Sequence, residues 1–505
     1  MDKETLKKFV FAPIEIAGFK AYFVGGCVRD ALLNKEPHDY DICTDATPDQ
    51  LHAIFRKFSN VSKNSEPFGV TMPLINDGTG KIEEIEIATL RKDITKGRHP
   101  KVDFTKSIEE DAQRRDFTIN AIYEDANGKI FDPTGGINDI KNKVLRFVGK
   151  MSDRLNEDPL RVFRAIRFMS KTGFTPNFTP VELNNIVHEM IRTNAFDEVS
   201  KERILKEIEG VFGGEHFDIV FKEYFWASLI PELIGMRPII DSLMGCKQSF
   251  KWHAEGSIIE TTDLHIVEIN DIKDLEKFRH LASNGNAWEH TRRVMTNMFN
   301  ELNTAKITDT HLRFVMMVAA FVHDIGKPIS ASYGDEKKNL FKVNGFDVYE
   351  IIPRVSSHDV DGVKPSYDFC RQLGMTCKDC DFVSELTKRH MRAHQILDMK
   401  NKARLWKFVQ WEHFDKLVML ARADQNACIK TVFEEWKGID DAVEKVRKFI
   451  DNPLPAPILK GQHLIDAGYK PGPTFKKKLD VAFEQQVNRN INSVNELLKI
   501  VKGVN

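Results

Sequence analysis

The segment AYFVGGCVRDALLNKEPHDYD, which runs from Ala21 to Asp41, decides the fold of the first part of the chain. It opens with a short β-prone run, continues with Gly25 and Gly26, and then changes to a helical pattern. In a unit of strand, glycine turn and helix, backbone N–H groups and the helix N-terminus can hold a phosphate. A glycine pair alone usually marks only a turn, so the acidic residues that follow are needed to indicate a phosphate site.

Acidic residues follow at two places. Asp39 and Asp41 are two positions apart, which puts them on one face of any strand. The segment 82–87 alternates and predicts a strand with Glu84 and Glu86 on one face. An Asp pair and an acid from a neighbouring strand can hold two Mg²⁺ ions roughly 3.5–4 Å apart, between which a nucleophile oxygen and a triphosphate are held.

Longer motifs identify a family. RRDFTINA at 114–121 places two arginines, which suit phosphates, beside Asp and Asn, and FDPTGG at 131–136 is a polar, turn-rich loop. With GGCVRD, DYD, EIATLR and EDPLRVFRAIRF, their order and spacing resemble the class II CCA-adding tRNA nucleotidyltransferases and the related bacterial poly(A) polymerases. The resemblance is strong to about residue 210, and LKGQHLIDAGYKPGP at 459–473 is similar to the end of bacterial members.

This resemblance implies an α+β nucleotidyltransferase head with a polymerase β-like palm, followed by an all-α neck, body and tail. It implies that Asp39 and Asp41 bind Mg²⁺, two ions in all, and that Glu86 is the third catalytic carboxylate. It also implies nucleotide contacts from the glycine turn, the double-arginine motif and the EDPLR motif, namely Gly25, Gly26, Arg29, Asp30, Arg114, Arg115, Asp116, Asn120, Asp158, Arg161 and Arg164.

The EDPLR motif has two interpretations. By resemblance, Asp158 and Arg161 read the incoming base. From the residues alone, Asp158 before Pro159 predicts a helix N-cap. Arg161, Arg164 and Arg167 equally predict an exposed helix face. A cap and a base-reading residue are compatible roles.

The segment from Arg91 to Val102 is basic, polar and interrupted by Gly97 and Pro100, which is typical of a mobile loop. It resembles the flexible loop that CCA-adding enzymes use in switching from CTP to ATP. Lys96 departs from the family pattern, in which an acid commonly precedes the Gly-Arg pair.

The second half contains a different set of polar residues. The apolar run from Phe314 to Val322 leads into HDIGKP at 323–328. Histidines and carboxylates from several helices can build a hydrolytic metal site with open positions. The spacing resembles the HD metal-phosphohydrolase domain, which implies a divalent metal of unknown identity bound by His290, His323, Asp324 and Asp424, with His358 and His390 as ligands where two metals are held. We assign structural roles to His265, His311 and His394.

Composition narrows the class of protein. The chain has 505 residues and a net charge of −1, so a polyanion partner must be held by local patches. No apolar run is long enough to cross a bilayer, so we expect no membrane partner. Seven cysteines, an odd number, fit the reducing cytoplasm, where we place the protein. Cys377 and Cys380 are spaced as metal ligands, but without a second pair we expect reduced thiols.

We therefore expect CCA addition to the tRNA 3′ end from CTP and ATP, with pyrophosphate released. Two alternatives stay open, a poly(A) polymerase and an HD metal phosphohydrolase that acts on RNA ends; a homodimer is also left open. The expected domains are a catalytic head, a base-recognition neck, a helical body, an HD domain and a tRNA-binding tail, at 1–150, 151–215, 216–284, 285–430 and 431–505.

Overall fold

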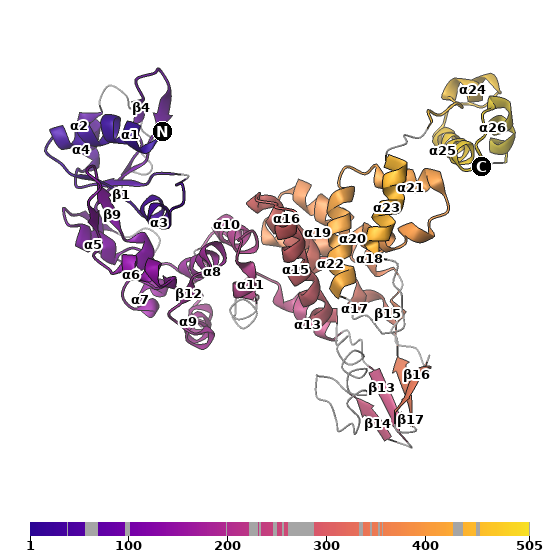
Figure 1. The fold of residues 1–505 in the computed structure, drawn as a ribbon, viewed down its shortest axis with the longest axis horizontal. Helices are drawn as coiled ribbons and strands as arrows, with labels where there is room; N and C mark the ends of the chain where they lie inside the picture. The colour runs from indigo at the N-terminus through magenta and orange to yellow at the C-terminus, as the bar shows by residue number, and fades with distance from the viewer. Residues whose placement is uncertain are drawn as a thin grey trace. The chain divides into compact units, whose positions relative to one another are not determined.

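The chain divides into two compact units, Met1–Ile234 and Gly235–Asn505, in the computed structural model (Figure 1). Each unit is described by itself. The residues described are 1–37, 39–55, 69–95, 101–197, 199–221, 231, 234–245, 250–254, 257–260, 287–332, 337–343, 346–351, 354–355, 357–427, 438–450 and 455–503. The predicted division into five domains is finer than these two units and stays a prediction.

A six-stranded mixed sheet forms the centre of the head. Strand β1 pairs antiparallel with β2 and β9, whereas β2 pairs parallel with β6. The order across the sheet is β10 (Ile130–Phe131), β9 (Tyr123–Asp125), β1 (Ala21–Val24), β2 (Ile42–Thr44), β6 (Ile87–Thr89) and β3 (Val70–Thr71). The predicted strand, glycine turn and helix are confirmed, since β1 leads through Gly25 into α3 (Gly26–Leu32).

One expectation about the head strands is wrong. The alternating segment 82–87 is not one strand: β5 (Ile82–Glu84) pairs with β4 (Leu74–Asn76), and the chain joins the main sheet only at β6. Alternation alone cannot show that a strand changes partner in its middle. The ends of the predicted mobile loop form an antiparallel pair, β7 (Arg91–Asp93) with β8 (Val102–Phe104), while 96–100 lie outside the described residues.

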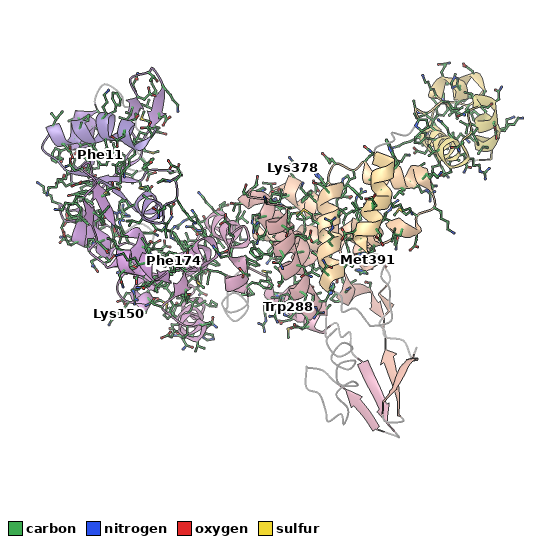
Figure 2. All side chains as sticks on the ribbon, in the orientation of Figure 1. Phe11, Lys150, Phe174, Trp288, Lys378 and Met391 are labelled. Carbon is green, nitrogen blue, oxygen red and sulfur yellow. The ribbon has the colours of Figure 1, made fainter. Side chains whose placement is uncertain are left out.

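The helices of the first unit cover the sheet and continue beyond it. Helix α8 is amphipathic, burying Val162, Phe163 and Ile166, and it packs against α10. Figure 2 shows the packed side chains, among them the buried Phe11 and Phe174. The helices, besides α3, are α1 (Lys3–Leu6), α2 (Ala12–Ile16), α4 (Pro48–Ile54), α5 (Ile108–Gln113), α6 (Gly136–Lys141), α7 (Met151–Glu157), α8 (Arg161–Thr172), α9 (Pro180–Arg192), α10 (Lys201–Phe212) and α11 (Phe217–Val220). A parallel pair, β11 (Val144–Leu145) and β12 (Thr175–Pro176), accompanies them.

The second unit is mostly helical, as predicted. Helix α16 is buried along its whole apolar run, and α15 packs against both α16 and α22. Its helices are α13 (Arg237–Gly245), α15 (Ala287–Thr304), α16 (Thr310–Val322), α17 (Lys327–Ser330), α18 (His358–Asp361), α19 (Val363–Leu373), α20 (Cys377–His394), α21 (Lys402–Val409), α22 (Phe414–Ala427), α23 (Ile439–Ile450), α24 (Gly461–Asp466), α25 (Pro473–Arg489) and α26 (Val494–Val501). Within the described ranges, no helix combines the length and apolarity needed to cross a membrane.

Strands in the second unit depart from the all-α expectation. A four-stranded antiparallel sheet has the order β14 (Ser257–Glu260), β13 (Phe250–Ala254), β17 (Phe346–Ile351) and β16 (Lys337–Val343). A small pair, β15 (Ala331–Ser332) with β18 (Arg354–Val355), is separate from it. These strands come from two segments far apart in sequence, and each segment alone carries only a short alternating pattern.

Candidate active site and candidate metal centre

The three predicted catalytic carboxylates lie at one edge of the head sheet. Ile42 of β2 is paired with Ile87 of β6, and the two strands are parallel. Asp41 and Glu86 directly precede these paired residues, so they lie side by side, each immediately before its strand. Asp39 precedes Asp41 by two residues, and all three residues have exposed surface, although neighbouring groups partly desolvate the carboxylates of Asp41 and Glu86.

Like charges interact within this group. Desolvation, followed by the charge of Asp41, raises the pKa of Glu86. Desolvation also raises the pKa of Asp41; the charge of Asp39 adds to this effect and the charge of Arg115 opposes it. A divalent cation relieves the repulsion between carboxylates that share a site. The donor set, three accessible carboxylates, therefore suits hard cations such as Mg²⁺.

The glycine turn closely approaches Asp41. Gly25 has φ +75° and ψ −127°, a conformation that side chains with a Cβ rarely adopt. A Cβ added at Gly25 would lie 3.2 Å from Oδ2 of Asp41. The backbone N–H of Gly26 donates a hydrogen bond to the Asp41 carboxylate, which acts to lower the pKa of Asp41. The turn and Asp41 therefore fix each other's position.

Asp111, which the sequence analysis missed, holds both predicted arginines. Its Oδ1 accepts a hydrogen bond from Nε of Arg114 at 2.9 Å, and its Oδ2 accepts one from Nε of Arg115 at 3.1 Å. The hydroxyl of Tyr123 also donates to Oδ2 of Asp111, at 2.8 Å. Asp111 is completely buried. The signal in the sequence was its i, i+3 and i, i+4 spacing to the two arginines, which follow directly after the end of α5.

A buried network joins four of the predicted nucleotide-binding residues. Nη1 of Arg29 donates to Oδ1 of Asn120 at 2.7 Å, and Nδ2 of Asn120 donates to Oδ1 of Asp116 at 3.2 Å. Nε of Arg164 donates to Oδ2 of Asp116 at 2.9 Å. Arg29 also pairs with Asp30, the residue next to it. The network connects helix α3, which follows the glycine turn, with helix α8.

The predicted base-reading residues lie at the turn before α8. Asp158 is not the N-cap, because the helix begins only at Arg161; Oδ1 of Asp158 instead accepts from the N–H of Leu160 at 3.1 Å. Oδ2 of Asp158 lies 3.4 Å from Arg203. The side chain of Arg161 donates to Glu157 at 2.8 Å.

Neither Arg161 nor Arg164 forms the exposed helix face that their spacing allowed. The guanidinium of Arg161 also donates to two backbone carbonyls, those of Arg154 at 2.9 Å and Arg114 at 2.8 Å. The guanidinium of Arg164 is paired with Asp116. Both arginines are therefore part of the structure that joins α8 to the double-arginine motif.

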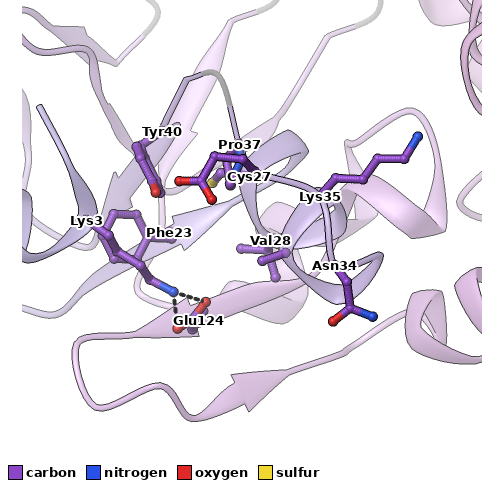
Figure 3. Close-up of a pocket in the computed structure, with 11 residues that line it drawn as sticks. Lys3, Phe23, Cys27, Val28, Asn34, Lys35, Pro37, Tyr40 and Glu124 are labelled. Carbon is purple, nitrogen blue, oxygen red and sulfur yellow. Dashed lines mark hydrogen bonds and ion pairs between the residues drawn. The ribbon is translucent and has the colours of Figure 1, made fainter.

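A pocket of about 410 Å³ lies beside the Asp39–Asp41 segment (Figure 3). Tyr40 lines it, with its ring centroid 5.5 Å from that of Phe23. Lys3 donates to both carboxylate oxygens of Glu124 at 2.6 and 2.8 Å. The contact of Tyr40 with Phe23 joins the short segment that carries the two aspartates to strand β1.

The six predicted HD-site residues come together in the second unit. All six are buried. They come from separate helices, since His290 lies on α15, His323 ends α16 and is followed by Asp324, His358 begins α18, His390 lies on α20 and Asp424 lies on α22.

These residues form two groups, in each of which the ligand atoms lie within 4.8 Å of one another. They are His290, His323 and Asp424, and Asp324, His358 and His390. Oδ1 of Asp424 lies 2.9 Å from Nε2 of His290, and Oδ1 of Asp324 lies 3.3 Å from Nε2 of His358. Within the described part of the chain, these are the only two groups of three or more ligand atoms that lie within 4.8 Å of one another. The carboxylates of the head do not meet this distance.

The hydrogen bonds of this cluster suit metal binding. Nδ1 of His323 lies 2.8 Å from the carbonyl oxygen of Ala320, and Nδ1 of His390 lies 2.6 Å from that of Thr387. A carbonyl only accepts, so each Nδ1 carries a proton and each Nε2 faces the cluster. Nε2 of His390 lies 3.2 Å from Nε2 of His358, and Nε2 of His323 lies 3.1 Å from Oδ2 of Asp324. Nε2 of His323 and Oδ2 of Asp324 are buried atoms without a well-aligned hydrogen bond. Oδ2 of Asp324 is nevertheless ion-paired with Nζ of Lys327 at 2.5 Å. The donor set of buried imidazole nitrogens and carboxylate oxygens is what fits a bound cation.

The histidines of the cluster differ in their charge states. Burial lowers the pKa of His290, and it lowers the pKa of His390 to about 3, so both rings are neutral at pH 7. Burial alone would raise the pKa of Asp324, but the charges of His323 and Lys327 hold it well below its ordinary value. Burial alone would lower the pKa of His323, but the charge of Asp324 beside it raises that pKa. Neutral imidazoles and ionised carboxylates are the forms that bind metals, so an ion bound here would displace a proton from His323.

Comparison with known proteins agrees with the motifs. Residues 21–146 match the model of the Poly A polymerase head domain. The CCA-adding enzyme of Bacillus subtilis (strain 168) is 39% identical over 239 residues, which cover 46% of this chain and 57% of that protein. The CCA-adding enzyme of Limosilactobacillus reuteri (strain DSM 20016) is 33% identical over 274 residues, covering 53% of this chain and 64% of that protein. The chain thus spans less than two thirds of the length of these relatives.

Solved structures agree in fold. The Thermotoga maritima CCA-adding enzyme complexed with tRNA aligns with a TM-score of 0.56 at 16% identity, covering 99% of this chain and 96% of that chain. The Bacillus stearothermophilus CCA-adding enzyme in complex with CTP aligns with a TM-score of 0.52 at 21% identity, covering 99% and 98%. The predicted resemblance to class II CCA-adding enzymes is confirmed, and so is the fold of an α+β head followed by a mostly helical remainder.

Proposed function

We propose that this chain adds C, C and A to the 3′ end of tRNA, using CTP and ATP without a nucleic-acid template and releasing pyrophosphate. The observation that carries the proposal is the parallel register of β2 and β6, which sets Asp41 beside Glu86 next to the glycine turn. A pure RNA-binding module has no need of three acids at one edge of a sheet. The similarity to CCA-adding enzymes supports the substrate class.

In this proposal the carboxylates of the head bind cations and the glycine turn lies beside the triphosphate. Asp39, Asp41 and Glu86 hold divalent cations, which we propose to be two Mg²⁺ ions and which would stabilise charge on the attacking and leaving oxygens. The turn at Gly25 and Gly26 keeps Asp41 in place and leaves the backbone close to the triphosphate.

Arginines bind the nucleotide's phosphates in the same proposal. Asp111 orients Arg114 and Arg115 through Nε, and Nη1 of Arg115 lies 3.9 Å from where a Cβ on Gly25 would be. Arginine is suited to this role because it offers several N–H donors in a fixed plane.

Base selection is assigned to Asp158 and Arg161. Cytosine and adenine both present an amine beside an unprotonated ring nitrogen, whereas uracil and guanine present a carbonyl beside a ring N–H. A carboxylate only accepts and a guanidinium only donates. Asp158 facing the amine and Arg161 facing the ring nitrogen would accept C and A, and each wrong base would leave charged groups unpaired.

The test of this function uses tRNA transcripts that end at the discriminator base, at CC or at CCA, each supplied with one nucleotide at a time. Addition that stops at CCA and uses only CTP and ATP is the expected result. A long A tail on any RNA would indicate the poly(A) polymerase alternative. Asp39→Ala and Asp41→Ala, separately, should abolish C and A addition but retain tRNA binding, because phosphate contacts by Lys and Arg supply most RNA affinity.

We also propose a metal-dependent phosphohydrolase centre in the second unit, on the specific observation of the two ligand groups around Asp324 and Asp424. His290, His323 and Asp424 would hold one divalent ion, and Asp324, His358 and His390 a second. The unmodified protein should hydrolyse a phosphomonoester or a 2′,3′-cyclic phosphate with Mg²⁺, Mn²⁺, Co²⁺ or Ni²⁺. Absence of hydrolysis with all four metals would remove this proposal.

The remaining proposals concern organisation. We propose the division into head, neck, body, HD domain and tail at the boundaries predicted from the sequence, and a cytoplasmic location. A homodimer stays open, and sedimentation of the full chain measures it directly.

A further inference from the structure

His394 makes a contact that its assignment as a structural residue does not explain. Its Nε2 lies 2.8 Å from Oδ2 of Asp424. The other oxygen of the same carboxylate, Oδ1, lies 2.9 Å from Nε2 of His290 and 3.9 Å from Nε2 of His323. One oxygen of Asp424 therefore faces the candidate metal centre, and the other is held from outside by His394.

The position of His394 on α20 explains how it reaches Asp424. His390 and His394 are four residues apart, so they lie one turn apart on the same face of the helix. His390 is completely buried and belongs to the group around Asp324, whereas His394 belongs to neither ligand group. Helix α20 thus carries the proposed ligand His390 on one turn and, on the next turn, His394, which contacts the proposed ligand Asp424.

A carboxylate with one bound oxygen needs a donor on its other oxygen. Without it, the side chain of Asp424 can rotate and present either oxygen, or both, to the ion. Hydrogen bonds from outside the ligand shell orient ligands and are worth about 10–100-fold in metal affinity. Ala320 and Thr387 act in this way on His323 and His390 through their carbonyl groups.

We infer that His394 is a positioning residue of the metal centre, which holds Oδ2 of Asp424 so that Oδ1 is directed at the ion bound with His290 and His323. This inference rests on the metal centre proposed above. It assigns a role to a residue that lies outside both ligand groups and that the HD-site pattern did not include.

The experiment measures Mn²⁺ binding by the full chain, with Asp39→Ala and Asp41→Ala present throughout so that the head does not contribute. In this parent, His394→Ala removes the donor, and His394→Gln replaces it with a side chain whose Nε2–H can donate at a similar reach. His311→Ala is the matched control, because His311 forms a His–Asp pair in the same unit, with Asp379 at 3.2 Å, but on the exposed surface.

Equilibrium dialysis and the Mn²⁺ electron paramagnetic resonance spectrum give affinity and coordination independently of turnover. We expect His394→Ala to weaken binding at one of two sites about 10–100-fold and to change the spectrum. His394→Gln should restore most of the affinity, and His311→Ala should match the parent.

Three results would count against the inference, in distinguishable ways. Unchanged affinity in His394→Ala would overturn it, since no orienting contact would then be needed. Equal losses in the Ala and Gln variants would overturn it in favour of His394 as a direct ligand. If the parent protein with Asp39→Ala and Asp41→Ala binds no Mn²⁺, the proposed metal centre is wrong, and so is this inference. Thermal unfolding of each variant checks that the chain still folds.

Discussion

Gly25 is the single residue whose replacement most directly tests the geometry of the head site. Gly25→Ala puts a Cβ 3.2 Å from Oδ2 of Asp41, at a φ of +75°. We expect a cost of about 1–3 kcal/mol in folding free energy and a loss of roughly tenfold or more in the rate of CMP addition, because Asp41 must move. The rate is measured on a tRNA that ends at the discriminator base.

Gly135→Ala is the control for this variant. Gly135 also precedes a helix and has φ +81°, but a Cβ there would meet nothing within 4 Å. It should therefore lose some stability and keep its rate of addition. Equal losses of rate in both variants would show that backbone strain alone, and not the approach to Asp41, explains the effect.

Asp116 should give the head a pH-dependent stability. Burial alone would raise its pKa, but the charge and hydrogen bonds of Arg164 lower it to about 2. A carboxyl with a lowered pKa stabilises the folded state above its ordinary pKa, and this contribution is lost as the pH falls from about 4 to about 2. Asp116→Asn should cost roughly 2 kcal/mol at pH 7, since each pKa unit is worth about 1.4 kcal/mol.

The difference in unfolding free energy between wild type and Asp116→Asn should shrink as the pH is lowered from 5 toward 3. This difference is measured by urea unfolding, in which hydrogen exchange of backbone amides in the first unit monitors the fraction of unfolded protein. A difference that stays constant over this range would contradict the role of the ionised Asp116–Arg164 pair.

Asp158 and Arg161 should control which base is added. Asp158→Ala should admit UMP or GMP before it lowers the rate with CTP, because it removes the acceptor that rejects a carbonyl. Arg161→Ala should lose selectivity and also stability, since Arg161 holds two backbone carbonyls and Glu157. Competition assays with all four nucleotides measure selectivity. Variants that remain strictly selective for CTP and ATP would contradict the assignment.

At the residue scale, sequence patterns predicted the polar residues of each site but not their partners. Asp39, Asp41 and the glycines stand in one short segment, so their association is local. His394 was assigned a structural role because its partner, Asp424, lies thirty residues away on another helix. Asp111 was missed because an acid on a helix is usually exposed, and its burial follows from packing that spacing does not reveal.

At the element scale, the errors concern strand partners. The alternation over 82–87 indicated a strand, but the pairing of β5 with β4 and of β6 with β2 depends on backbone partners elsewhere in the chain. The pairing register of two strands depends on both of them. The alternation of apolar and polar residues in one strand indicates only which of its faces is buried. Glu86 lies in the break between β5 and β6, directly before Ile87.

The contact between the turn after α16 and helix α18 should be intolerant of any side chain. A Cβ at Gly326 would lie 2.1 Å from the carbonyl oxygen of His358 and 2.6 Å from the N of Gly362, both backbone atoms. Gly326→Ala must therefore displace α18, at a cost of about 1–3 kcal/mol. We expect Mn²⁺ binding by the group that contains His358 to be lost, measured by dialysis.

Gly461→Ala, in α24 of the same unit, is the control, because a Cβ there meets nothing within 4 Å. It should bind Mn²⁺ as the wild type does. Retained binding in Gly326→Ala would mean that α18 shifts without moving the His358 ring, and would contradict a rigid link between the two segments.

At the scale of the whole molecule, the sequence predicted the α+β head and the helical remainder because motif order and helical periodicity extend over long segments. It did not predict the sheet of β13, β14, β16 and β17. That sheet joins segments at 250–260 and 337–351, with α15 and α16 between them in sequence. Pairing over such a separation leaves no local signal beyond short alternation.

The two candidate sites should act independently, because each is built within one compact unit. The head residues from Gly25 to Arg164 belong to the unit 1–234, and the ligands from His290 to Asp424 belong to the unit 235–505. Substitutions at sites that share no partners usually have additive effects. His323→Ala with Asp324→Ala should abolish Mn²⁺ binding in the second unit and leave the initial rate of CMP addition within about twofold. Conversely, Asp39→Ala with Asp41→Ala should abolish addition and leave that Mn²⁺ binding unchanged. Loss of both properties in either variant would show that the two units depend on each other, and would require a coupling between the head and the metal centre.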